Sequence, residues 1–409
     1  MYCEITNAYE NMQQNNNKIF RKTELQLNER LSELYECNVY LKREDLQYVR
    51  SFKCRGAYNA ILNVKDINKT IVCASAGNHA QGIAHACVKL GLKCDIYVPE
   101  STPLQKINKI KKFGKDNLNL FIMGKSFDDC LDEAKKNSDG KIFIHPFDND
   151  DIVNGQGTIA LEIFQDIDPD IIICSIGGGG LISGILKYVH DNDKKCKIIG
   201  VEAEKSDSMY LSLKNKKIIT LDKIDNFVDG TCVKTVGEKT FKICKKYLSL
   251  EDIKIVTKGK ICNDILNLYQ EDGIIAEPAG VLSISSLSQI YNIKGKNVVC
   301  ILSGGNNDVL RYQEIMFHNL IYLKTRYYFV VEFKQKPGEL MNFILEVTRY
   351  HADIIRFEYI KSNNKSCGSV LIGLDMIDKK IDIIIKKMDD MGYKYKKINE
   401  YDILYDLLI

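Results

Sequence analysis

Short runs of apolar, mostly β-branched residues alternate with segments of helical spacing between residues 38 and 320. The runs cover residues 38–42, 70–75, 94–99, 119–123, 171–176, 197–203 and 297–303. Such runs are typical of strands buried on both faces, and their alternation with helices predicts βα units in mostly parallel sheets. Several runs end in glycine- or serine-rich turns, so the carboxyl ends of these strands are the expected ligand-binding edge. Residues 11–17, rich in Asn and Gln, are expected to be a polar lead-in.

The pattern changes after residue 320. Residues 327–333 are expected to form a strand, and the elements that follow complete a β-α-β-β-α-β order. This order predicts a ferredoxin-like α+β domain. We therefore expect a catalytic domain at residues 1–320, with a smaller subdomain inserted at about 40–140, and a second domain at 325–409. A module of this kind serves either packing and dimerisation or the sensing of a small ligand, and the pattern alone leaves both open.

Composition narrows the class of protein. A chain of 409 residues is too long for one compact core, and 45% hydrophobic with 27% charged residues is typical of a globular protein. The 57 basic and 54 acidic side chains leave a net charge of +3, which gives no reason to expect a nucleic acid or a membrane as partner. No apolar run approaches the roughly 18 residues of a membrane span, and we expect no leader peptide. The 14 cysteines form no CxxC pair or zinc-type cluster, which favours buried thiols in a reducing cytoplasm.

The first chemically suggestive turn is the segment SFKCRGAYNAI at residues 51–61. Ser51 is expected to cap a helix whose first turn carries Lys53. The positive end of the helix dipole and the nearby Arg55 both disfavour the ammonium form of Lys53. A partly uncharged amine is what Schiff-base chemistry requires. A solvated surface lysine is the alternative, and this segment alone does not exclude it.

Three further strand-end turns are candidates for binding anions or polar groups. At residues 73–86, backbone N–H groups at a helix start form a seat for a carboxylate or phosphate, with Asn78 and His79 at its edge. The run Gly177–Gly180 leaves the backbone free to wrap a phosphate at a helix N-terminus. It fits neither the GxGxxG dinucleotide pattern nor a Walker loop. The segment CILSGGNND places the Ser303 hydroxyl at the same sheet edge, although each turn taken singly could be an ordinary strand-end turn.

Together these turns resemble the threonine ammonia-lyases (threonine dehydratases), which are pyridoxal-phosphate enzymes. The resemblance runs in order from about residue 19 to the C-terminus and is carried by the segments LKREDLQYVRSFKCRGAYNAI, ASAGNHAQG, NGQGTIALE, GGGGLISG, VEAE, AEPAGV and LSGGNND. It implies an α/β catalytic domain of the tryptophan-synthase-β-like fold, the pyridoxal-phosphate fold type II, built from two open, mostly parallel βα subdomains. It also implies pyridoxal 5'-phosphate as the cofactor.

The resemblance assigns expected roles position by position. Lys53 matches the lysine that holds the cofactor covalently and takes the substrate Cα proton. Asn78 matches the residue that hydrogen-bonds the ring hydroxyl, and Ser303 the one that faces the pyridine nitrogen. The expected cofactor-binding residues are Lys53, Asn78, Gly177, Gly178, Gly179, Gly180, Leu181 and Ser303. The expected substrate-carboxylate seat is formed by Ser75, Ala76, Gly77, Asn78 and His79.

The same resemblance implies conversion of L-threonine, and more weakly of L-serine, to 2-oxobutanoate or pyruvate and ammonia. Ala76 stands where the similar serine racemases carry a serine, so we expect little racemisation. Glu202 matches their divalent-metal pattern but Ser208 stands at the later acidic position, so we expect no essential metal. Glu277 in AEPAGV lies just before a predicted helix and could be either an acid in the pocket or a helix-dipole carboxylate, and it is not counted among the expected catalytic residues. Residues Asn154–Gly157 are expected near the pocket.

The C-terminal segment resembles the single ACT-like regulatory domain of shorter biosynthetic threonine dehydratases. The resemblance implies the first step of isoleucine biosynthesis, feedback inhibition by isoleucine with valine opposing it, and a homo-oligomer, either a tetramer or a dimer. The turn Lys336–Pro337–Gly338–Glu339 is where an amino acid could meet backbone donors. Two alternatives stay open: a catabolic serine/threonine dehydratase and an amino-acid sensor without turnover.

Overall fold

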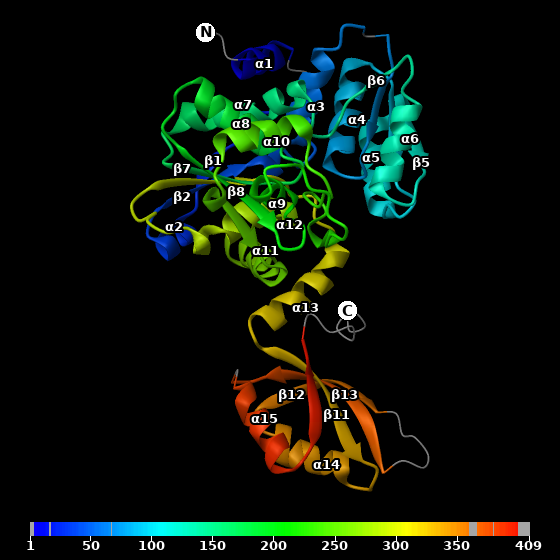
Figure 1. Cartoon of the computed structure of the whole chain (residues 1–409), viewed down its shortest axis with the longest axis vertical. Helices are drawn as coiled ribbons and strands as arrows, with labels where there is room; N and C mark the ends of the chain where they lie inside the picture. Colours follow the sequence, from blue (N-terminus) through cyan, green and yellow to red (C-terminus); the bar gives the residue numbers. More distant parts are fainter. Residues whose placement is uncertain (1–3, 16–17, 67, 360–365, 379, 400–409) are drawn as a thin grey trace. The chain divides into compact units, whose positions relative to one another are not determined.

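The computed structural model describes residues 4–15, 18–66, 68–359, 366–378 and 380–399. The chain folds as two compact units, Met1–Val309 and Leu310–Ile409 (Figure 1). The predicted domain limits, 1–320 with an insertion near 40–140 and 325–409, stay predictions, and residues 400–409 lie outside the described part.

The larger sheet of the first unit has six strands in the order β1-β2-β10-β7-β8-β9. All neighbours are parallel except β1 and β2, which pair in the antiparallel sense. The strands are β1 (Leu25–Leu27), β2 (Asn38–Arg43), β7 (Ile171–Ser175), β8 (Lys197–Ala203), β9 (Ile253–Val256) and β10 (Asn297–Leu302). The central strands β7 and β10 are buried at nearly every position, as expected for strands covered on both faces.

The smaller sheet of the first unit has four parallel strands in the order β5-β4-β3-β6. Its strands are β3 (Ile71–Ala74), β4 (Cys94–Val98), β5 (Leu118–Ile122) and β6 (Ile142–Phe143). The predicted strand runs therefore divide between two parallel sheets, and the turns after β3, β7 and β10 each lie at the carboxyl end of a strand. In parallel βα units this is the end at which ligands bind.

Helices cover both sheets of the first unit. They are α1 (Glu4–Gln14), α2 (Glu29–Tyr35), α3 (Lys53–Leu62), α4 (Asn78–Leu90), α5 (Leu104–Gly114), α6 (Phe127–Lys136), α7 (Asp150–Asp166), α8 (Gly180–Asp191), α9 (Ser208–Lys214), α10 (Glu238–Tyr247), α11 (Lys258–Asp272) and α12 (Pro278–Ser285). Figure 1 shows α7 and α8 on one face of the larger sheet and α11 and α12 on the other. The helix α3 packs against α7 and also against α4, so it links the two sheets.

The N-terminal segment differs from the prediction. Residues Glu4–Gln14 form the helix α1, whereas the sequence predicts a polar lead-in over residues 11–17. Ile5, Ala8 and Met12 are buried at helical spacing, and this narrow apolar stripe holds the helix against the core. The prediction is wrong because the stripe is short and the Asn- and Gln-rich run that follows Met12 hides it. Residues 16 and 17 lie outside the described part.

The second unit has the predicted ferredoxin-like order. It begins with the helix α13 (Tyr312–Tyr322) and continues with β11 (Arg326–Lys334), α14 (Glu339–Phe343), a π-helical turn (Ile344–Thr348), β12 (Ala352–Tyr359), β13 (Cys367–Met376), α15 (Ile381–Asp390) and β14 (Lys394–Ile398). The strands form an antiparallel sheet in the order β12-β13-β11-β14. Alternate residues of β11, including Phe329, Val331 and Phe333, are buried in this unit's own core.

Two structural findings bear on the compositional arguments. The thirteen cysteines of the described ranges are all free thiols, and ten of them are buried. None of the helices in those ranges has both the length and the apolar character needed to traverse a lipid bilayer.

Candidate active site

A cavity of about 530 Å³ lies in the first unit, lined by the turns that follow β3, β7 and β10. Every residue predicted for the site lines it: Lys53, Ser75, Ala76, Gly77, Asn78, His79, Gly177, Gly178, Gly179, Gly180, Leu181 and Ser303. The individual roles of these residues remain predictions. Other residues of the lining were not predicted as site residues, among them Phe52, Pro146, Ser175 and Asn306.

Lys53 is the first residue of α3 and is half-buried in the wall of the cavity. Its Nζ donates to the main-chain oxygen of Pro146 at 3.0 Å. Burial lowers the pKa of Lys53 to about 8, and the negative charge of Glu277 opposes this shift. A sizeable fraction of the amine is therefore uncharged near neutral pH, as imine chemistry requires.

The predicted helix cap is wrong in position. Phe52 occupies the N-cap of α3 without a side-chain hydrogen bond, and Ser51 lies one residue earlier. The Ser51 hydroxyl accepts from the Lys53 N–H at 3.4 Å, which is too long for a strong capping bond. The main chain of Ser51 instead forms a bridge to Gly304, which ties the start of α3 to the turn after β10.

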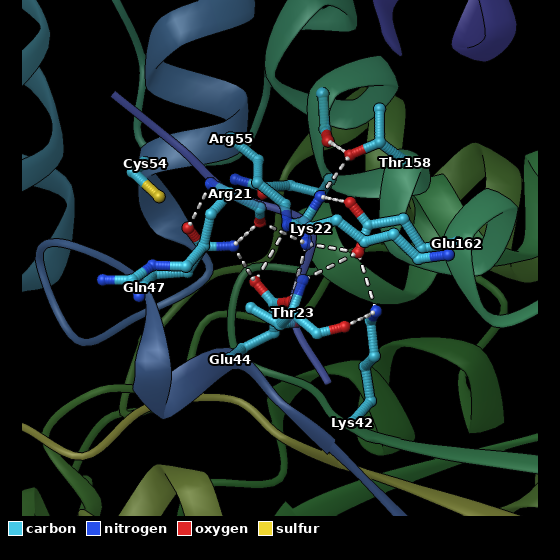
Figure 2. Close-up of polar contacts among 12 residues, drawn as sticks. Arg21, Lys22, Thr23, Lys42, Glu44, Gln47, Cys54, Arg55, Thr158 and Glu162 are labelled. Carbon is cyan, nitrogen blue, oxygen red and sulfur yellow. Dashed lines mark hydrogen bonds and ion pairs between the residues drawn. The ribbon is translucent and has the colours of Figure 1, made fainter. Parts of the chain in front are cut away.

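The predicted effect of Arg55 on Lys53 is also wrong. Arg55 is fully buried and its guanidinium is bonded to the carboxylates of Glu44 and Glu162, at 2.7–2.8 Å (Figure 2). Burial alone would lower the pKa of Arg55, but Glu162 and Glu44 raise it well above its ordinary value. Because two carboxylates neutralise this charge, Arg55 does not act on the Lys53 amine, whose pKa is lowered by burial.

The Arg55 cluster is an ionic network without exposed members. Lys42 on β2 bonds Glu162 of α7 at 2.7 Å and the main-chain oxygen of Thr23 at 2.8 Å. The Thr23 hydroxyl donates to Glu44, which lies directly after β2. Figure 2 shows these side chains converging from separate segments around Arg55, which lies in the first turn of α3. The network thus joins the helix that carries Lys53 to both β2 and α7.

The glycine run Gly177–Gly180 connects β7 to α8. Gly179 has a positive φ of 94° and is the N-cap of α8, a backbone conformation that favours glycine. A Cβ on Gly178 would lie 2.3 Å from ring carbons of Phe147, and a Cβ on Gly177 would lie 2.9 Å from Thr231. The run therefore needs glycine partly because the chain itself packs closely against it. Its N–H groups and the start of α8 remain well suited to hold a phosphate.

The turn Ser75–His79 leads from β3 into α4, whose first residue is Asn78. The N–H groups of the first helical turn have no partner within the helix and can bind a carboxylate. His79 is buried, and its Nε2 contacts the main-chain oxygen of Ile144 at 3.3 Å. Burial, with a smaller effect of the Lys53 charge, lowers the pKa of His79 to about 3, so this imidazole is neutral.

Glu277, for which the sequence left open a pocket acid or a helix-dipole carboxylate, is the N-cap of α12 and lies at the cavity. It is buried in the lining of the cavity, and its Oε1 accepts from the Asn78 amide at 2.7 Å. Burial and then the charge of Asp229 raise the pKa of Glu277 to about 7, while the bond from Asn78 lowers it. Because Asn78 and Glu277 are 199 positions apart, no local pattern could have revealed the contact.

Ser303 follows β10 and is almost fully buried. Its hydroxyl donates to the main-chain oxygen of Ala279 at 3.2 Å, and the Ser175 hydroxyl contacts it at 3.4 Å. A serine in this position offers a neutral hydrogen-bonding partner to a ligand and no negative charge.

Residues Asn154–Gly157, which were expected near the pocket, are not part of its lining. They lie in α7, where a Cβ on Gly155 would lie 2.6 Å from Gly56 of α3. Gly155 thus lets α7 and α3 approach closely. Glu202 also lies outside the lining: it accepts the N–H groups of Met209 and Tyr210 at the start of α9, at 2.9 and 2.8 Å.

The lining suits a phosphorylated pyridine aldehyde. The amine with the lowered pKa would hold its aldehyde carbon, and the glycine-rich helix N-terminus would hold its phosphate. The amide would bind the ring hydroxyl, and the neutral hydroxyl would face the ring nitrogen. Among the described residues, Lys53 forms no ion pair that would have to be broken. The donor set therefore fits pyridoxal phosphate.

Comparisons with known proteins agree with this chemistry. Residues 17–304 match the family described as pyridoxal-phosphate dependent enzyme, and residues 318–408 match the C-terminal regulatory domain of threonine dehydratase. The chain is 49% identical over 395 residues, 95% of each chain, to the biosynthetic L-threonine dehydratase IlvA of Halalkalibacterium halodurans. It is 45% identical over 404 residues to that of Bacillus subtilis, covering 97% of this chain and 95% of the relative. A structure of processed threonine deaminase isoform 2 from Solanum lycopersicum matches with a TM-score of 0.71 and 35% identity, covering 77% of this chain and 93% of that one.

The fold and the site thus define an enzyme of pyridoxal-phosphate fold type II, and the chain belongs to the pyridoxal-phosphate dependent enzyme family. The resemblance to the threonine dehydratases and the cofactor expected from the motifs are confirmed. The second unit of the chain contains the region that matches the regulatory domain of threonine dehydratase.

Proposed function

We propose that this chain catalyses the dehydration and deamination of L-threonine to 2-oxobutanoate and ammonia, the first step of isoleucine biosynthesis. The observation that carries the proposal is the 49% identity to a biosynthetic L-threonine dehydratase over 95% of both chains. L-serine is the expected weaker substrate and would give pyruvate. The reaction releases one water molecule when the β-hydroxyl leaves and uses one when the Cα–N bond is hydrolysed. It therefore consumes no net water.

Four groups are proposed to hold the cofactor: the Lys53 amine, the N–H groups of Gly177–Gly180, the Asn78 amide and the Ser303 hydroxyl. The N-terminus of α8 would add its positive dipole end to the phosphate seat. Pyridoxal phosphate, when bound, supplies an electron sink for the electron pair left on Cα when a proton is removed.

The chain's own part in the reaction is to orient the substrate and to move its Cα proton. The N–H groups at the start of α4 would bind the substrate carboxylate. The Lys53 Nζ would accept the Cα proton, because its lowered pKa leaves it partly uncharged near neutral pH. Ala76 presents a methyl group and cannot donate a proton, so return of the proton from another face, and hence racemisation, should be slow.

The direct test is a comparison of Lys53→Ala with Lys89→Ala. Lys89 is an exposed lysine in the last turn of α4, and its replacement removes the same charge away from the cavity. Borohydride reduction of the holoenzyme followed by mass spectrometry should place the cofactor adduct on Lys53. Lys53→Ala should form no adduct and release no ammonia from threonine, while Lys89→Ala keeps both. Ammonia release by Lys53→Ala would refute the mechanism.

We further propose that isoleucine inhibits the enzyme, that valine opposes it, and that the active form is a cytoplasmic homo-oligomer, a tetramer or a dimer. The match of residues 318–408 to a regulatory domain supports the binding of an amino-acid effector. An effector must bind two states unequally to change activity. Added isoleucine should therefore shift the threonine saturation curve of the purified chain. If it changes neither activity nor thermal stability, this part of the proposal fails.

A further inference from the structure

A ring of hydrogen bonds connects Asn78, Glu277 and Asn306 in the wall of the cavity. The Asn306 Nδ2 donates to the main-chain oxygen of Val49 at 2.8 Å. A main-chain carbonyl can only accept, so this contact fixes which end of the Asn306 amide is nitrogen. The same Nδ2 donates to the Asn78 Oδ1 at 2.8 Å, and this in turn fixes the orientation of the Asn78 amide.

The other side of the ring is fixed in the same way. The Asn78 Nδ2 donates to the Glu277 Oε1 at 2.7 Å. The Glu277 Oε2 accepts the main-chain N–H of Asn306 at 3.2 Å, and a main-chain N–H can only donate. Both ends of the ring are thus set by main-chain groups. A flipped Asn78 amide would place an oxygen against the Glu277 carboxylate and a nitrogen against the Asn306 nitrogen.

The turn after β10 leaves room for this carboxylate. A Cβ on Gly304 would lie 2.4 Å from the Glu277 Oε1, closer than any side chain could approach. The Glu277 N–H donates to the Gly304 main-chain oxygen at 3.1 Å, so the two segments are held together at this point. No positive φ accounts for glycine at position 304, and the space taken by Glu277 does.

We propose that Glu277 is a positioning residue that fixes the Asn78 amide, with one Nδ2–H committed to Glu277 and the other left for a ligand in the cavity. The proposal rests on the proposed function, in which Asn78 contacts the cofactor. It adds a residue that orients Asn78, besides the effect of its charge on Lys53.

Only a carboxylate satisfies both contacts. Glutamine has one acceptor oxygen, so Glu277→Gln can accept from the Asn78 amide or from the Asn306 N–H but not from both. The loss affects a charge-assisted hydrogen bond in a buried site, where such bonds are strong. Asp229 and Lys106 act electrostatically on this carboxyl, and its own charge acts on Lys53 and Lys109.

The first experiment titrates the cofactor-free protein with pyridoxal phosphate and follows the absorption of the bound form, without turnover. Glu277→Gln should weaken cofactor binding about 10-fold, the value of one hydrogen bond to a charged group. In an Asn78→Ala background the same change should weaken binding clearly less, because the amide that Glu277 orients is missing and only the effect of its charge on Lys53 remains. Equal effects in both backgrounds, or no effect in the wild-type background, would overturn the proposal.

The second experiment measures thermal midpoints of the same four cofactor-free proteins. The decrease caused by Glu277→Gln should be at least halved when Asn78 is already alanine, and an undiminished decrease argues against the ring. This result stands even if the wild-type protein forms no adduct at Lys53, in which case the proposed function fails and the ring is judged separately. Glu202→Gln is the matched control, because the buried carboxyl group of Glu202 accepts two main-chain N–H groups outside the cavity lining. This variant should lower the midpoint and leave cofactor binding within about twofold of wild type.

Discussion

The buried ionic network beneath α3 allows a prediction in which a second mutation repairs the first. Lys42, Glu44, Arg55 and Glu162 are all 0% exposed, and their two positive and two negative charges cancel. Glu162 bonds both Lys42 and Arg55, so Glu162→Gln leaves two cations facing one carboxylate (Figure 2). An uncompensated charge buried in this way costs about 3–5 kcal/mol of folding free energy.

The expected change in thermal stability follows from the size of the first unit. For a unit of this size, Met1–Val309, a loss of about 3–5 kcal/mol lowers the midpoint of thermal unfolding by about 5–8 °C. This is the decrease expected for Glu162→Gln. The double variant Lys42→Met with Glu162→Gln removes one charge of each sign and leaves the Arg55–Glu44 pair neutral. It should therefore melt higher than Glu162→Gln alone, although it carries more changes.

Scanning calorimetry of the cofactor-free proteins at one scan rate measures these midpoints under comparable conditions. Asp166→Asn is the matched control, because Asp166 also lies on α7 and pairs with Lys22, but both side chains are 30–42% exposed. Breaking that exposed pair should cost less than about 1 kcal/mol. If the double variant melts at or below Glu162→Gln, charge balance is not what this network requires, and the reasoning is refuted.

Two further predictions concern the cavity. The lowered pKa of Lys53, about 8 against an ordinary 10.5, means that the folded protein binds fewer protons than the unfolded chain between those values, so the stability of the cofactor-free protein should rise with pH from 8 to 10.5. Lys53→Met should remove this rise and should be more stable than the wild type below pH 8, by at most roughly 3 kcal/mol. Urea unfolding of both proteins at pH 7.5 and 9.5 measures the difference. Parallel pH dependences of the two unfolding free energies would contradict the lowered pKa. Gly178→Ala should weaken cofactor binding because its Cβ meets the Phe147 ring, and Phe147→Leu in the same chain should restore part of it. Failure of the second change to restore binding would show that the Phe147 contact is not the reason for glycine at this position.

Much of the fold could be predicted from local patterns. Continuous β-branched runs report burial on both faces, and their alternation with helices is enough to predict parallel βα units. The order of elements after residue 320 predicts the ferredoxin-like second unit in the same way. The helix α1 was missed because its apolar stripe has only three buried positions within a polar segment.

The position of the site could also be predicted, because glycine runs and strand-end turns are local features. Lys53, Asn78, Gly177–Gly180 and Ser303 follow predicted strands or begin helices, and all line the same cavity. What each polar side chain contacts could not be predicted. Arg55 is near Lys53 in sequence, yet its charge is taken by Glu44 and by Glu162, which is 107 positions away.

The βα pattern, the second unit and the turns that form the site can therefore be predicted from local sequence, since they depend on the spacing of apolar residues and on backbone freedom. That Glu277 faces Asn78, that Gly155 packs against α3, and that burial lowers the pKa of Lys53 follow from the three-dimensional fold. Hydrogen-bond partners and desolvation depend on which distant segments of the chain meet. The pattern of apolar residues along the sequence indicates which residues are buried, but it does not indicate which groups they contact.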